Sequence, residues 1–329
     1  HIERQTEWLV RKPTADLHVQ QWMMEGPFDS SYSLAKLNRE LVKSMQQIGV
    51  PVSIKNTEGP GDYTPNLNYL KDHPQILNLL SVKGEDKNKL SDVCSRNLYP
   101  PRVNDMQSRI NLLHCYGWEE TGFPNKWVRD FNDNLQGITV MSKHVKKILQ
   151  DNGVHIPIGI SGLGVEQNKS EITELEIEAK RFKYLHVSSC FPRKGIDELL
   201  EAYGNIFKLD DDVSLIIKTF PNPHNTINSK LNSLKQNNQN YPHVHIINYD
   251  LKESEMLWLY KISDVLVLPS YCEGFGLPIA EAMNAELPVI TTNWSGQLEL
   301  CNAETAWLVD YKFEQAETHL NQFCSAWAR

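Results

Sequence analysis

The chain has 329 residues, a length that favours about two domains. Hydrophobic residues make up 40% and charged residues 22%, a composition that is typical of globular proteins and argues against a disordered or fibrous chain. The formal net charge of -8 argues against a general affinity for nucleic acid, whose phosphates attract clustered Lys and Arg.

The six cysteines are far apart and include no C-x-x-C pair, so the sequence predicts reduced thiols in a cytoplasmic protein rather than a zinc site or a disulfide framework. No apolar run approaches the roughly 20 residues that span a bilayer, and no signal peptide opens the chain. The chain begins at His1 without a methionine, so we expect a processed chain or a piece of a longer one.

In the first half of the chain, apolar runs that predict strands alternate with runs of helical spacing. A strand over 16–23 is followed by the loop "EGPFDSS" and by the helix "YSLAKLNRELVKSMQQIG". Further strands are expected at 50–56, 109–115 and 137–142, and further helices in "NKWVRDFND" and "SKHVKKILQDNG".

The alternation restarts in the second half. Its expected strands lie at 181–189, 213–220, 244–250, 264–270 and 288–293, and its helices at Gly195–Phe207 and in "KESEMLWLYKIS", with Asp250 as the N-cap of the latter. The last stretch, "FCSAWAR", is interpreted as part of a helix. This pattern predicts an α/β protein of two Rossmann-like domains, each with a parallel sheet, facing each other across a cleft.

One motif, "LPSYCEGFGLPIAEAM", follows an expected strand and leads into an expected helix near Leu277. Gly274 and Gly276 allow backbone N–H groups to approach a ligand, and the helix N-terminus favours an anion such as a diphosphate. Glu273 lies on the loop, whereas Glu281 lies about one turn inside the helix, where a carboxylate can bind vicinal hydroxyls. The alternative is a tight turn with solvated glutamates, which the coincidence of glycines, proline, strand and helix disfavours.

The stretch "LPSYCEGFGLPIAEAMNAELPVITT" resembles the signature of retaining glycosyltransferases of the GT-B fold, group 1 or family 4 type. "SSCFPRKGIDELLEAY" is similar to the family's Arg/Lys-Gly segment, and "WEETGFPNKW" to bacterial polysaccharide-biosynthesis members. The resemblance covers most of the chain. It implies an N-terminal acceptor-side domain over 1–165 and a nucleotide-sugar donor-side domain over 166–329, which we expect to continue beyond the C-terminus.

The resemblance also implies roles for individual residues. It assigns Glu273 to the transferred sugar, Glu281 to the nucleotide ribose, and Lys194 with Arg193 to the diphosphate. The backbone of Gly274, Phe275, Gly276 and Leu277 would hold the diphosphate and the sugar. His114, at the end of an apolar strand, would lie near the reaction centre, and Gly26, Ser30 and Ser31 would approach the donor from the loop after the first strand. Ser189 departs from the family, which often has arginine there.

The resulting hypothesis is a cytoplasmic, retaining enzyme that transfers a hexose-type sugar from a nucleoside diphosphate sugar to a saccharide or lipid-linked acceptor, with no cofactor and no metal. The aspartates at 210–212 are interpreted as a turn and not as a metal site. Two alternatives stay open: a catalytically silent GT-B module that serves as a binding or scaffold domain, and a GT-B sugar-nucleotide epimerase.

For each of two further stretches, a functional and a structural interpretation stay open. The basic run at 143–147 is either a solvated helix face or a peripheral contact with the inner face of the membrane. Trp118, Glu119 and Glu120 either shape an acceptor site or are a buried tryptophan and two solvated glutamates.

Overall fold

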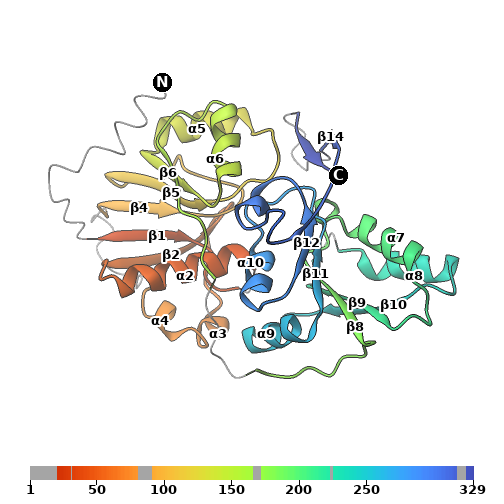
Figure 1. Ribbon diagram of the computed structural model, residues 1–329. Helices are drawn as coiled ribbons and strands as arrows, with labels where there is room; N and C mark the ends of the chain where they lie inside the picture. The colour runs from red at the N-terminus through yellow and green to blue at the C-terminus, as the bar shows by residue number, and fades with distance from the viewer. Residues whose placement is uncertain (1–20, 31, 81–90, 166–171, 223–224, 317–323) are drawn as a thin grey trace. The chain divides into compact units, whose positions relative to one another are not determined.

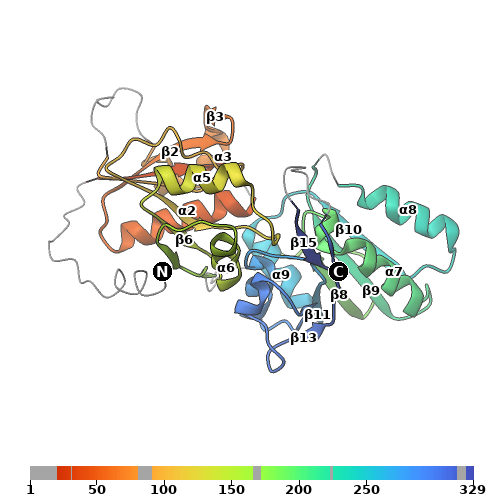
Figure 2. The ribbon, with the colours of Figure 1, turned by 90° about the horizontal axis from the view of Figure 1, so that it is seen from above.

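The computed structural model describes residues 21–30, 32–80, 91–165, 172–222, 225–316 and 324–329. The chain divides into two compact units, each with its own sheet (Figures 1 and 2). Unit 1 comprises the chain up to Gly117 and Gly122–Gly162, and unit 2 comprises Trp118–Thr121 and Leu163–Arg329. A short segment from the first half of the chain therefore belongs to unit 2.

Unit 1 is built on a seven-stranded sheet in which the short strand β3 runs antiparallel to β2 and the other strands run parallel. Its first long helix, α2 (Ser33–Gln47), lies in the stretch where the sequence predicts a helix and buries Ala35, Val42 and Met45. The strands are β1 (Trp22–Gly26), β2 (Val52–Glu58), β3 (Gly61–Asp62), β4 (Val93–Arg96), β5 (Ile110–Tyr116), β6 (Gly137–Val140) and β7 (Ile158–Ile160), in the order β3-β2-β1-β4-β5-β6-β7. The helices are α2 (Ser33–Gln47), α3 (Leu67–Leu70), α4 (Pro74–Leu77), α5 (Asn125–Asn134) and α6 (Lys143–Asp151).

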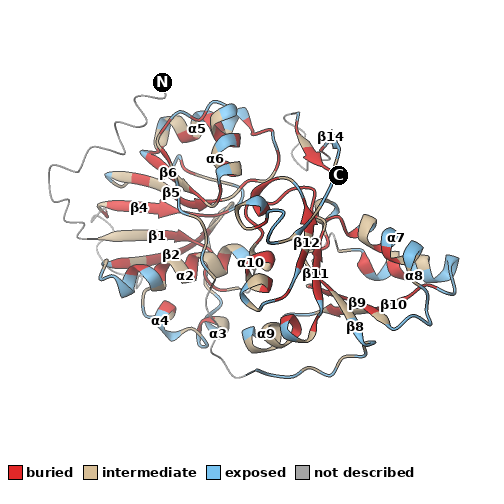
Figure 3. Cartoon of the chain, in the orientation of Figure 1, coloured by how far each residue is buried: buried red, intermediate tan, exposed pale blue. Residues whose placement is uncertain are grey.

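Unit 2 has a six-stranded parallel sheet with a hydrophobic core on each face. The neighbouring residues Leu215 and Ile216 belong to different core clusters, because successive side chains of a strand point to opposite faces. Most residues of β9 (Val213–Thr219), β11 (Val265–Leu268) and β12 (Val289–Thr292) are therefore buried, as Figure 3 shows. The strands of this sheet are β8 (Phe182–Val187), β9 (Val213–Thr219), β10 (His243–Asn248), β11 (Val265–Leu268), β12 (Val289–Thr292) and β13 (Trp307–Val309), in the order β10-β9-β8-β11-β12-β13.

The helices of unit 2 are α7 (Ile196–Ile206), α8 (Ile227–Asn237), α9 (Glu253–Ile262) and α10 (Leu277–Asn284), with the 3₁₀ turns η1 (Pro192–Lys194) and η2 (Gly296–Glu299). A separate antiparallel pair joins β14 (Phe313–Gln315) and β15 (Ala326–Ala328). Each of the two large sheets has a switch point, where successive connections run to opposite sides of the sheet. It lies between β1 and β4 in unit 1, and between β8 and β11 in unit 2. In open α/β sheets, ligands bind beyond the carboxyl ends of the strands at such a point.

Three local predictions are wrong. Helix α9 has Lys252 and not Asp250 as its N-cap, because the Glu255 carboxylate accepts the Lys252 backbone N–H at 2.7 Å and the helix begins later. The end of the chain forms strand β15 and not a helix, because its backbone pairs with β14. The first strand extends through Gly26, into the predicted loop, while most of the predicted range 16–23 lies outside the described residues. All six cysteines are free thiols.

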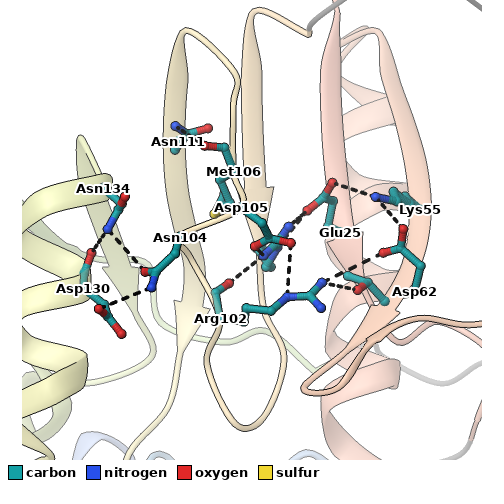
Figure 4. Close-up of polar contacts among 12 residues, drawn as sticks. Glu25, Lys55, Asp62, Arg102, Asn104, Asp105, Met106, Asn111, Asp130 and Asn134 are labelled. Carbon is teal, nitrogen blue, oxygen red and sulfur yellow. Dashed lines mark hydrogen bonds and ion pairs between the residues drawn. The ribbon is translucent and has the colours of Figure 1, made fainter. Parts of the chain in front are cut away.

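The switch point of unit 1 contains a buried ion pair between Arg96 and Glu25, and Figure 4 labels Glu25 and the neighbouring Arg102 and Asp105. The Arg96 guanidinium donates to the Glu25 carboxylate through Nε at 2.7 Å and also through Nη2. Its Nη1 donates to Asp105 Oδ1 and to the Arg102 carbonyl, both at 2.6 Å. Only 2% of the Arg96 side chain is exposed, so this guanidinium is occupied by protein groups and fastens the loop after β4 to β1.

We expect Arg96→Met to lower the free energy of unfolding of unit 1 by about 3–5 kcal/mol, because it leaves Glu25 buried without its main partner. Urea denaturation measures the change. Lys147→Met is the matched control, since it breaks the exposed Lys147–Asp151 pair (2.7 Å) and should cost less than about 1 kcal/mol. Equal losses in the two variants would contradict the assigned role of the buried pair.

Candidate active site

The loops after β8 and β11 meet at the switch point of unit 2. Lys194, at the end of η1, places its Nζ 2.6 Å from Oε1 of Glu273, which follows β11. Gly195 makes this approach possible: it has a φ of 66°, and a Cβ there would lie 2.0 Å from the Pro269 carbonyl oxygen. Only glycine fits against the loop after β11 at this position. The Arg-Lys-Gly sequence therefore places the Lys194 ammonium beside Glu273.

Glu273 is 6% exposed and is held by both its backbone and its side chain. Its N–H donates to Ser295 Oγ at 2.9 Å, and its carbonyl accepts from the N–H of Gly296 at 2.9 Å. Burial raises the pKa of its carboxyl group, but Lys194 and Arg193 outweigh this effect, so the pKa lies below its ordinary value. The carboxylate is therefore charged at neutral pH, which suits a hydrogen-bond acceptor better than a proton donor.

Arg193 lies on the other side of the same carboxylate. Its Nη1 is 3.8 Å from Glu273 Oε2 and donates to the Cys272 carbonyl at 3.2 Å, while its Nη2 is 2.9 Å from Glu119 Oε1. Burial lowers the pKa of the guanidinium, but Glu119 and Glu273 raise it more, so the pKa lies above its ordinary value. Glu119 belongs to the short segment of unit 2 that follows β5 in the chain.

The loop from Glu273 to α10 presents backbone donors. Gly276 is the N-cap of α10 with a φ of 91°, a left-handed conformation that favours glycine. Within the part of the chain that the structure describes, no hydrogen bond engages the N–H groups of Phe275, Gly276 or Leu277. Together with the positive end of the helix dipole, these donors form a favourable environment for an anion.

Glu281 lies one turn inside α10, and the Tyr260 hydroxyl donates to its Oε2 at 3.0 Å. Tyr260 is buried in the core between the sheet and α9, and burial, then Glu281, raises the pKa of its hydroxyl. The Tyr260 hydroxyl thus fixes the position of the Glu281 carboxylate.

The predicted site residues of the first half of the chain lie in unit 1. His114, in β5, is 5% exposed and its Nε2 is 3.0 Å from Asn38 Oδ1. Because Asn38 Nδ2 donates to the carbonyls of Pro27 and Asn97, Asn38 Oδ1 is the acceptor and His114 Nε2 carries the proton. Burial lowers the pKa of His114 to about 3, so the ring is neutral. Its Nδ1 is buried without a described partner.

Gly26 and Ser30 have packing roles in unit 1. A Cβ at Gly26 would lie 2.4 Å from Asn38 Nδ2, so this glycine lets β1 approach α2. The Ser30 carbonyl accepts from Arg39 Nη1 at 2.6 Å. Ser31 lies outside the described residues. The contact of Gly26, Ser30 and Ser31 with a nucleotide-sugar donor stays a prediction. The roles assigned to the residues in unit 2 also stay predictions.

The sequence analysis did not identify Ser295 and Gly296, which contact the backbone of the Glu273 loop. Ser295, whose hydroxyl donates to Gln297 Oε1 at 2.5 Å, follows β12 and supports the Glu273 N–H. Gly296 is needed there because a Cβ would lie 2.2 Å from the Gly274 carbonyl oxygen. The signal was the Ser-Gly pair one residue after the strand "PVITTN", since the carboxyl ends of neighbouring parallel strands meet at one sheet edge.

Two solved structures share the fold. The sucrose-phosphate synthase of Thermosynechococcus elongatus aligns with a TM-score of 0.68 at 17% identity, over 88% of this chain and 86% of that one. Anabaena HepE in complex with UDP-glucose aligns with a TM-score of 0.59 at 15% identity, over 88% and 85%. The fold is that of the GT-B class, as the sequence predicts.

Residues 166–326 match the family model described as "Glycosyl transferases group 1". The chain is also 30% identical, over 159 residues, to the capsular polysaccharide biosynthesis glycosyltransferase CapM of Staphylococcus aureus; this match covers 46% of the chain and 40% of CapM. Residues 166–326 are thus similar to the group 1 glycosyl transferases. Among the described residues, no helix is both long enough and apolar enough to cross a membrane.

The buried His114 predicts a pH dependence of stability. Between its folded-state pKa of about 3 and an unfolded value of about 6.5, only the unfolded chain binds the proton, so stability is lost as the pH falls below 6.5. Going from pH 7 to pH 5 should cost about 2 kcal/mol through this histidine, and His114→Asn should remove that part of the loss. Urea unfolding at both pH values measures it.

The exposed His155 provides the control. His155→Asn should keep the pH dependence of the wild type. An unaltered pH dependence in His114→Asn would show that His114 is not buried in its neutral form.

Proposed function

We propose that this protein is a retaining glycosyltransferase that moves a hexose-type sugar from a nucleoside diphosphate sugar to a saccharide or lipid-linked acceptor. The observation that carries the proposal is the 2.6 Å Lys194–Glu273 pair at the switch point, inside the family segment and beside the open amides of α10. Residues 166–329 would hold the donor and residues 1–165 the acceptor. CapM and the UDP-glucose complex of HepE support polysaccharide chemistry and a UDP-sugar as the first donor to test.

The geometry suits departure of a diphosphate. As the bond between the anomeric carbon and the diphosphate oxygen breaks, negative charge grows on the leaving group. Lys194, Arg193 and the N-terminus of α10 supply positive charge at the same sheet edge. Glu273, kept ionised by the two cations, would accept hydrogen bonds from the sugar, and Glu281 would accept them from the ribose. The proposal includes a cytoplasmic location and peripheral membrane contact through α6.

Donor binding tests the assignment. Lys194→Gln and Glu281→Gln should each weaken binding of the donor by about 10- to 150-fold, because each removes a charged hydrogen bond of about 1.5–3 kcal/mol. Isothermal titration with a panel of nucleoside diphosphate sugars measures this, and Lys235→Gln, on an exposed position of α8, is the control. If both site variants bind every donor as the wild type does, the assignment is wrong.

Product analysis separates the rival functions. Transfer to an acceptor supports the proposal. A donor that is bound but neither hydrolysed nor transferred indicates a silent module, and interconversion of the free donor indicates an epimerase.

The proposal assigns the neutralisation of the diphosphate to protein groups rather than to a metal ion. Transfer should therefore continue within about twofold of its rate in excess EDTA, since a loss of less than about 0.4 kcal/mol leaves the barrier almost unchanged. A radiochemical or coupled assay with and without EDTA measures this. Loss of turnover in EDTA, restored by Mg²⁺ or Mn²⁺, would contradict metal independence.

A further inference from the structure

Arg193 is engaged by carboxylates at the position where the donor diphosphate would bind. Its Nη2 lies 2.9 Å from Glu119 Oε1, and its Nη1 lies 3.8 Å from Glu273 Oε2. The Glu119 contact is the shorter, and it uses the guanidinium nitrogen that does not contact the Glu273 loop. A phosphate oxygen that binds Nη2 must therefore displace Glu119 or share the guanidinium with it.

The charged side chains around Arg193 offset one another. The two cations, Arg193 and Lys194, face the two carboxylates Glu119 and Glu273, so their formal charges cancel. The next residue, Glu120, is 7% exposed and adds a further carboxyl group that raises the pKa of Arg193. A diphosphate carries a negative charge of its own and is attracted by a cation, so Glu119 opposes its binding by occupying Arg193.

The backbone of the segment that carries Glu119 is held by hydrogen bonds that do not involve Arg193. Thr121, two residues along, accepts the Ala326 N–H through Oγ1 at 2.8 Å and donates its own N–H to the Ala326 carbonyl at 3.4 Å. The Ala328 N–H in turn donates to the Tyr271 carbonyl at 3.1 Å, next to the Glu273 loop. Trp118 is 4% exposed. The segment thus keeps its position when the charge of Glu119 is removed, and its carboxylate is a preformed competitor for the guanidinium.

We propose that Glu119 competes with the donor diphosphate for Arg193 and thereby weakens the binding of nucleoside diphosphates to this site. The inference rests on the proposed function, since it takes the diphosphate as the ligand of Arg193. Glu119 acts on the diphosphate indirectly, through Arg193. The same competition acts on the nucleoside diphosphate product, so Glu119 favours its release after transfer.

The test measures the affinity of UDP, GDP and ADP for the protein by isothermal titration and uses the tightest of the three as the probe. Glu119→Gln keeps the size of the side chain and should increase the affinity for the probe nucleotide about three- to tenfold. The substitution frees Arg193 Nη2 for a charge-assisted hydrogen bond to the phosphate. Glu201→Gln, on the exposed side of α7, makes the same change in net charge and should leave the affinity within the error of the wild-type value. Unchanged or weaker binding by Glu119→Gln would overturn the inference.

A double-mutant cycle shows whether Glu119 acts through Arg193. In an Arg193→Gln background, Glu119→Gln should no longer tighten the probe. If the tightening persists there, it arises from the general field of the carboxylate and the inference is wrong. A wild type and a Glu119→Gln variant that both fail to bind all three nucleotides would instead overturn the proposed function, so the two failures are distinguishable.

Discussion

The buried contact between Lys194 and Glu273 is the interaction on which the candidate site depends. Burial of this 6% exposed carboxylate raises its pKa, but the lysine at 2.6 Å and Arg193 lower the pKa more and keep the group ionised. The contact exists because two loops from neighbouring strands approach to the point where Gly195 has no room for a side chain. Backbone geometry and charge at this site therefore depend on each other.

The sequence was sufficient for the features that are local. The strand before the Glu273 loop, the glycines of the loop and the helix from Leu277 all follow from a short stretch of chain, and the structure has each of them. The same holds for the presence of helix α2 and for parallel sheets in both halves. Periodicity and turn chemistry act over a few residues, so they can be predicted without knowing the fold.

The contacts that the sequence could not predict join distant residues. Tyr260 reaches Glu281 from another helix, Ser295 supports Glu273 from the next strand, and Glu119 reaches Arg193 from the first half of the chain. Taken alone, each of these side chains indicates no functional role. Its partner is determined by the order of the strands in the sheet and not by spacing in the sequence. The Asp250 cap failed for a different, local reason: Glu255 accepts the N–H of Lys252, three residues earlier, and the helix begins there.

The two sheets have the same kind of switch point, but the arginines at the two switch points differ in their access to solvent. Both switch points contain an arginine that pairs with a glutamate, Arg96 with Glu25 in unit 1 and Arg193 with Glu119 in unit 2. Only 2% of the Arg96 side chain is exposed and its nitrogens donate to protein oxygens, whereas 24% of the Arg193 side chain is exposed. An arginine of the first kind stabilises a fold, since no ligand can reach it without breaking the core. One of the second kind retains a path to solvent, and with it the capacity to exchange a carboxylate for a phosphate.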